Sequence, residues 1–238
     1  MKRANPKTIA LFSLTLTAAS LNLVSPVLQA ETIHTNTSDM MQEGAPSSDL
    51  LTIQQQWAEA NYRIENEDEK LAAFEQLISD IQALSDANPN NADYWIWLGI
   101  SKSTYAGVKG GLGALGFAKE ARDALKKAID INDKALNGSA YTSLGILFHK
   151  VPGWPIGFGS DKTAEKLLKK ALEINPNGID PNYFYGEFLF NDGKYSAAKT
   201  HLMKAKAAAP RPARPLADAG RHQEIEALLI KVEKKLLR

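Results

Sequence analysis

Apolar residues from position 49 onward recur with the spacing of helix faces. Leu50, Ile53, Trp57 and Ala60 fall on one side of a helix, and a second set repeats the pattern. The second set is Leu71, Phe74, Leu77, Ile78, Ile81 and Leu84. No stretch shows the alternation of β-branched and polar residues that is typical of strands. The pattern therefore predicts an all-α chain.

Short phrases repeat along this helical region and predict how the helices are paired. Each phrase holds alanine, leucine, alanine and a terminating residue at offsets of four, three and five positions. The phrases are Ala121/Leu125/Ala128/Asp133, Ala164/Leu168/Ala171/Pro176 and Ala198/Leu202/Ala205/Pro210. The alanines let a neighbouring helix approach closely, the leucine fills the groove, and proline stops the helix. Each phrase follows an aromatic and glycine cluster, and these clusters are Trp95/Leu98/Gly99, Tyr141/Leu144/Gly145 and Tyr185/Gly186.

This arrangement resembles tetratricopeptide repeats, in which a helix A and a helix B form each unit. Residues 182–215 are closest to the standard repeat, with Asn191-Asp192-Gly193 as the tight turn between helices, and residues 50–90 are degenerate. The resemblance implies a helical-repeat solenoid over 49–215, with about three full repeats after a degenerate helix pair. The apolar stripe of residues 216–238, which includes Leu228, Leu229, Val232 and Leu236, predicts a C-terminal capping helix.

Two repeats carry long insertions between helix A and helix B. The insertions are Gly107–Gly116 and Val151–Gly159, and both are rich in glycine. We expect them to form long loops in the same slot of successive repeats. Repeats of this kind are similar to the T component of tetratricopeptide-associated tripartite periplasmic (TRAP) transporters, and more distantly to the helical-repeat domain of regulators of microtubule dynamics. The first resemblance implies an accessory subunit that docks a solute-binding protein and holds an apolar ligand.

The first 30 residues have the order of a secretory signal peptide. Lys2, Arg3 and Lys7 precede an uncharged segment, 8–24, and Leu28-Gln29-Ala30 offers a small residue at the cleavage site. An uncleaved anchor is the competing interpretation, but serines and threonines dilute a stretch shorter than the roughly 20 apolar residues of a span. We therefore expect cleavage after Ala30, a periplasmic or secreted protein without a membrane anchor, and a disordered leader over the polar residues 31–48.

Charge and cysteine content narrow the range of functions. The chain has 28 Lys and Arg against 27 Asp and Glu, and no cysteine. This near balance argues against nucleic-acid binding, which normally uses a basic face. Without cysteine, stability must come from packing rather than from disulfides.

The candidate chemical motifs are weak in their sequence context. Gly111, Gly113 and Gly116 match a dinucleotide-binding pattern, but a helical segment rather than a strand precedes them. The histidines, which are His34, His149, His201 and His222, lack metal-ligand spacing. The acidic run 65–69 lacks the glycine of a calcium loop, and Ser160 fits the N-cap of a helix beginning near Thr163. We expect no catalytic residue, cofactor or metal.

Aromatic and insertion residues are the best candidates for a binding site. They are Trp95, Trp97, Tyr105, Leu112, Trp154, Phe158 and Tyr185. The first helices of a solenoid line its concave surface, where aromatic rings with polar tips suit contact with a partner. The alternative is that these rings only seal the solenoid. The sequence thus favours a non-catalytic interaction module that binds a periplasmic protein or peptide, such as a solute-binding protein. A nucleotide-binding protein and a self-assembling homo-oligomer are the other hypotheses.

Overall fold

The computed structural model describes residues 47–111 and 113–237, and every regular element in these ranges is an α-helix. The helices are α1 (Ser48–Tyr62), α2 (Glu67–Ala87), α3 (Ala92–Lys109), α4 (Ala114–Ile131), α5 (Ala135–Lys150), α6 (Asp161–Ile174), α7 (Ile179–Asn191), α8 (Tyr195–Lys206) and α9 (Pro215–Leu236). The predicted all-α class is confirmed. The predicted signal peptide and most of the leader lie outside the described residues, and the leader prediction runs too far because Ser47 already caps α1.

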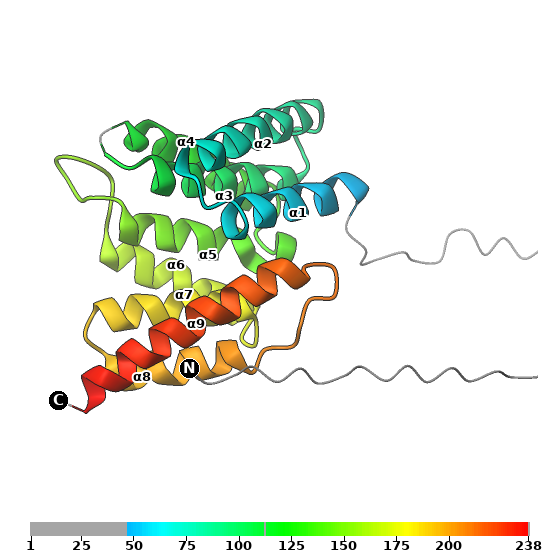
Figure 1. Cartoon of the computed structure of the whole chain (residues 1–238). Coiled ribbons are helices and arrows are strands. Elements are labelled where there is room, and N and C mark those ends of the chain that lie inside the picture. The colour runs from blue at the N-terminus through cyan, green and yellow to red at the C-terminus, as the bar shows by residue number, and fades with distance from the viewer. Residues whose placement is uncertain (1–46, 112, 238) are drawn as a thin grey trace, which may run out of the picture. The chain divides into compact units, whose positions relative to one another are not determined.

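The helices are stacked as A and B pairs in a solenoid. The pairs α1/α2, α3/α4, α5/α6 and α7/α8 are each in contact, and each B helix also contacts the A helix that follows it (Figure 1). Successive A helices touch one another from α1 to α7. Within the described residues no helix is long and apolar enough to cross a membrane.

The repeated glycine and leucine positions set how closely A and B helices cross. A Cβ atom built on Gly99 would lie 2.5 Å from Cγ of Leu125, and one on Gly145 would lie 2.8 Å from Cγ of Leu168. Each leucine therefore fills space that only a glycine on the A helix leaves free. The alanines of the phrases are completely buried at the same crossings, namely Ala121, Ala128, Ala164, Ala171, Ala198 and Ala205.

The first insertion does not form the long loop that we predicted. α3 continues to Lys109 and α4 begins at Ala114, so the insertion lengthens both helices and leaves a short connection. Packing explains the extra turns, because Tyr105 is 1% exposed and meets Phe117 edge to face with ring centroids 4.6 Å apart. Gly110 ends α3 with a positive φ of 60°. The second insertion does form a loop, from Val151 to Ser160.

The last helix packs on the final helix pair, as predicted for a capping helix, and it also reaches the first helix. α9 contacts α7 and α8 as the next A helix would, but it also contacts α1 (Figure 1). The contacts between the A helices and α9 therefore form a closed ring, and α9 covers the concave side. Its buried apolar residues are Ala217, Ile225, Leu228, Leu229 and Val232, whereas Leu236, expected on the same stripe, is 42% exposed.

Candidate functional site

Four of the aromatic candidates lie under α9 or inside the helix pairs instead of on an open concave surface. Trp97 is 2% exposed, with Trp57 at its edge and the Arg214 guanidinium 5.0 Å from its ring centre. Trp95 donates its indole N–H to the Pro89 carbonyl at 3.0 Å. Trp95, Tyr105 and Tyr185 are all at most 9% exposed. α9 and the neighbouring helices cover these four rings, so they do not lie on an open concave surface, and their burial agrees with the alternative that they seal the solenoid.

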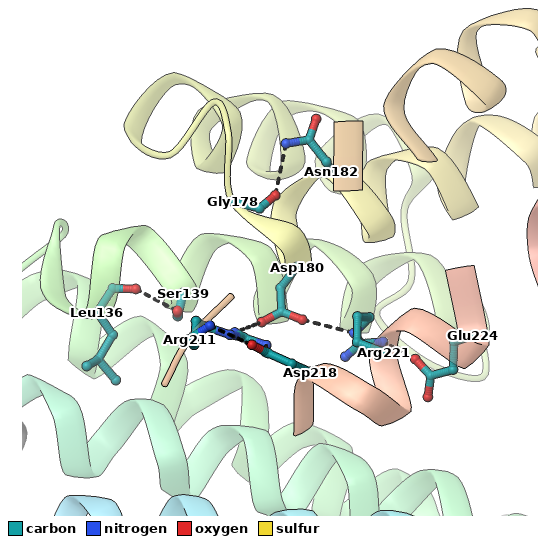
Figure 2. A network of polar contacts seen from close by, with 9 residues as sticks. All are labelled: Leu136, Ser139, Gly178, Asp180, Asn182, Arg211, Asp218, Arg221 and Glu224. Atoms are coloured by element: carbon teal, nitrogen blue, oxygen red, sulfur yellow. Dashed lines mark hydrogen bonds and ion pairs between the residues drawn. The ribbon is translucent and has the colours of Figure 1, made fainter. Parts of the chain in front are cut away.

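A network of ion pairs fixes α9 and the segment before it (Figure 2). Asp180, at the start of α7, accepts hydrogen bonds from Arg211 at 2.6 Å and from Arg221 at 2.9 Å. Arg211 also donates to Asp218 at 2.7 Å, and Arg221 pairs with Glu224. Burial alone would raise the pKa of Asp180, but the surrounding arginines outweigh it and hold this pKa below its usual range. The ionised carboxylate therefore ties α7 both to the beginning of α9 and to the segment that precedes it.

The contact between α9 and α1 depends on a small residue. A Cβ atom built on Gly220 would lie 2.4 Å from Cδ1 and Cε1 of Tyr62. Burial raises the pKa of Tyr62 to about 12, so its hydroxyl stays protonated at neutral pH. Arg221 next to Gly220 stacks 4.5 Å from the ring centres of Tyr183 and Phe184. The concave side is thus a packed interior, with little room for a peptide.

The second insertion forms a projecting loop that presents apolar side chains. Trp154 is 90% exposed and Ile156 is 59% exposed, and a cis peptide bond joins Trp154 to Pro155. Backbone hydrogen bonds close the loop. Gly159 N–H donates to the Pro152 carbonyl and Ser160 N–H donates to the Phe148 carbonyl, both at 2.9 Å. The loop is therefore an ordered projection between α5 and α6 (Figure 1).

The base of this loop is anchored on the solenoid. Phe158 packs edge to face on Phe148 of α5, with centroids 5.3 Å apart, and lies 4.8 Å from the guanidinium of Arg122 on α4. A Cβ atom on Gly159 would lie 1.8 Å from the Val151 carbonyl oxygen, so only glycine fits there. Phe158 is a partly buried anchor of the loop, and Trp154 is its exposed tip.

The two insertions meet at one edge of the molecule. A Cβ atom built on Gly157 would lie 3.4 Å from Cδ1 of Leu115, at the start of α4. Leu112, the remaining candidate, is outside the described residues. Together the α5–α6 loop and the beginning of α4 form a surface that we name the insertion edge, defined by Leu115, Trp154, Pro155 and Ile156.

The histidine and serine residues that we considered as candidates for chemistry form hydrogen bonds that stabilise the fold. The His149 ring contacts Asp161 through Nδ1 at 2.7 Å and Asn191 through Nε2 at 3.0 Å, which links α5 to α6 and α7. Ser160 accepts a hydrogen bond from the Thr163 N–H, as an N-cap should, and α6 begins at Asp161. Among the described residues no group of histidine and acidic side chains could hold a metal ion. Of the glycines of the nucleotide-like motif, Gly111 and Gly113 lie in the connection between α3 and α4, and Gly116 lies within α4.

Comparison with known proteins agrees with this architecture. Residues 162–219 match the family model for the tetratricopeptide repeat. The fold is that of a tetratricopeptide-repeat solenoid. A thermophilic TPR protein of Thermus thermophilus superposes with a TM-score of 0.51 and 15% identity, over 80% of this chain and 98% of that one.

Two further solved structures are more distant. MamA is similar with a TM-score of 0.41 and 19% identity, over 72% of this chain and 95% of that one. PilF of Pseudomonas aeruginosa is similar with a TM-score of 0.32 and 14% identity, over 78% and 93% of the two chains. A search of the curated proteins finds no sequence match.

Proposed function

We propose that this tetratricopeptide-repeat protein is a non-catalytic interaction module that binds a protein partner through the insertion edge. One observation carries the proposal. Trp154 is 90% exposed at the tip of a loop whose backbone is held by hydrogen bonds and by glycines that no other residue can replace. An ordered loop loses little conformational entropy on binding, so most of the energy of burying its tip goes into affinity.

The chemistry of the tip indicates the kind of partner. Tryptophan is the residue most typical of binding hot spots, and it needs an apolar pocket with an acceptor for its indole N–H. Ile156 is 59% exposed on the same loop and extends the apolar surface. The partner should therefore offer a hydrophobic cleft and not a charged surface.

The setting of this interaction is part of the proposal. The basic and apolar N-terminal segment supports export and cleavage after Ala30, so the partner would be periplasmic. The similarity of the inserted repeats to transporter T components supports a second, narrower function, in which a solute-binding protein docks on the insertion edge. Both versions use the same surface and differ in the identity of the partner.

Site-specific crosslinking in the native host tests the proposal. A photoreactive phenylalanine analogue replaces Trp154 in one variant and Asp192 in the control. Asp192 lies in the corresponding A–B turn of the last repeat, which has no insertion, and it is also exposed. We expect one discrete protein adduct from position 154 and none from position 192. Equal adducts from both positions, or none from position 154, would contradict the proposal.

A second experiment measures the affinity of Trp154 variants for the partner that crosslinking identifies. Trp154→Ala should weaken binding by about 2 kcal/mol, or roughly 30-fold in Kd, because the residue is the proposed hot spot. Trp154→Phe should retain part of the affinity. The melting temperature should not change in either variant, since the side chain contacts solvent in the free protein. If Trp154→Ala left the affinity unchanged, the assignment of the insertion edge as the binding site would be wrong.

A further inference from the structure

The two ends of the solenoid carry opposite charge. Residues 48–87, which span α1 and α2, contain nine acidic and two basic residues. At the other end, α8 contains three lysines and no acidic residue, and residues 230–237 of the chain contain three lysines and one glutamate. α2 and α8 lie at opposite ends of the stack (Figure 1).

The exposed face of α2 combines small and acidic side chains. Ala72, Ser79 and Ala83 follow one another along the middle of this face, with Asp68 and Asp86 on one side and Glu69 and Asp80 on the other. All of these residues are exposed. None of the ion pairs in residues 47–111 and 113–237 uses these four carboxylates. We name this surface the acidic face.

The outer face of α8 has the opposite charge in a matching arrangement. Ser196, Thr200, Met203 and Ala207 run along its middle, flanked by Lys199 and Lys204. With Leu236 of α9 they line a shallow hollow of about 560 Å³. Met203 and Leu236 are 49% and 42% exposed, and the neighbouring Ile230 and Leu237 are 68% and 89% exposed. Lys235 of α9, which lies 6.0 Å from the ring centre of Tyr195 of α8, and the adjacent exposed Lys234 extend this surface, which we name the basic face. Within it Lys199 already pairs with Glu233 of α9 at 3.2 Å.

We propose that the basic face of one molecule binds the acidic face of a second copy of this chain, so that copies associate head to tail. The exposed apolar side chains of α8 and α9 would cover the alanine stripe of α2, and the flanking lysines would meet the flanking carboxylates. Apolar burial supplies affinity, and the charges set partner and orientation. Because the two faces belong to opposite ends, the contact is heterologous and gives open chains or rings instead of closed two-fold dimers. This inference is independent of the insertion edge.

Salt dependence gives the first measurement. Sedimentation velocity of the protein as its host produces it should show oligomers at about 50 mM salt that dissociate at about 500 mM, where exposed charges are screened. Oligomers that persist unchanged at high salt, or a monomer at every concentration and salt, would overturn the proposal.

Charge reversal then tests which faces meet. Asp68→Lys/Glu69→Lys/Asp80→Lys gives the acidic face a net positive charge, and Lys204→Glu/Lys234→Glu/Lys235→Glu gives the basic face a net negative charge. Each variant alone should self-associate at least tenfold more weakly than the wild type. Mixed in equal amounts, the two variants should associate again, because each reversed face now meets its complement.

A matched control carries the same change of charge elsewhere. Lys119→Glu/Lys126→Glu/Lys166→Glu reverses three exposed lysines on α4 and α6 and should leave association within twofold of the wild type. Failure of the mixed variants to associate would refute the pairing of these two faces. Vesicles of anionic phospholipid serve as the competing partner. If the wild type binds them through Lys204, Lys234 and Lys235 without self-associating, the basic face is a lipid-binding surface and the proposal is wrong.

Discussion

Replacing Gly220 with alanine tests whether α9 packs against α1. The new Cβ atom would lie 2.4 Å from Cδ1 and Cε1 of Tyr62 and 2.6 Å from its Cγ. Ordinary carbon–carbon contacts are about 3.5–4.0 Å, so the ring has to move by about 1 Å. Trp57 meets the Tyr62 ring edge to face at 5.8 Å and restricts this movement. The rearrangement should cost about 1–3 kcal/mol, as overpacking does in other cores.

Alanine also has a higher helix propensity than glycine, which opposes the steric cost, so this stabilisation has to be measured separately. Glycine inside a helix is about 0.5–1 kcal/mol less favourable than alanine. Gly107 in α3 and Gly116 in α4 have no atom within 4 Å of a built Cβ, so Gly107→Ala and Gly116→Ala report this gain alone. Both controls should stabilise the protein. Gly220→Ala should fall below them by the steric cost, about 1–3 kcal/mol in the free energy of unfolding.

Urea unfolding followed by far-UV circular dichroism measures all of these differences. A Tyr62→Leu background completes the cycle, because removal of the ring should let Gly220→Ala behave like the two controls. If Gly220→Ala stabilises the wild type as much as the controls do, then α9 does not lie against α1 and the closed ring of helices is incorrect.

Two more predictions concern the loop and the ion pairs. Gly159→Ala should disrupt the insertion loop and weaken partner binding, because its Cβ would overlap the Val151 carbonyl. Gly153→Ala is the control and should bind normally in the same assay, because the nearest atom to its Cβ is 3.4 Å away. Asp180→Asn should lower the free energy of unfolding by about 3 kcal/mol near pH 7, since the buried Arg221 and the partly buried Arg211 lose a charged partner. The folded-state pKa of Asp180 lies below its ordinary value, so this loss should stay constant between about pH 5 and 7 and shrink below about pH 4. Urea titrations of wild type and variant across pH would contradict the assignment if the loss grew on acidification.

The pairing of helices within a repeat could be predicted because the information is local. Gly99 meets Leu125, Gly145 meets Leu168, and each pair is less than 30 positions apart in the sequence. Small residues such as these glycines mark the side of a helix on which another helix can pack closely. The same locality made Ser160 recognisable as a helix cap.

The prediction of a long loop for the first insertion was wrong because its glycine content favours a loop whereas its packing favours helix. Several glycines between Gly107 and Gly116 favour a loop, and glycine does cost helix stability. The contact between Tyr105 and Phe117 outweighs that cost and extends both helices. Nothing in the spacing of the glycines reveals that the two rings meet.

The position of α9 could not be predicted for a different reason. Its apolar stripe shows that one face is covered but not by which helices. The covering residues are distant in sequence, as Gly220 meets Tyr62 and Arg211 meets Asp180. Consequently the buried tryptophans and tyrosines were predicted on an open surface, while Trp154, whose environment depends on its own loop, has the exposure expected of a contact residue.

The contact of α9 with α1 has a consequence for how this protein unfolds. In a linear solenoid each repeat depends only on its neighbours, so the end repeats fray first and the array tolerates added or deleted repeats. Here the last helix supports the first, so neither end can open without loosening the other. Unfolding should be a single cooperative transition, and amide protons of α1 and α9 should exchange together. The number of repeats is also fixed, because one repeat more or fewer would move α9 away from α1.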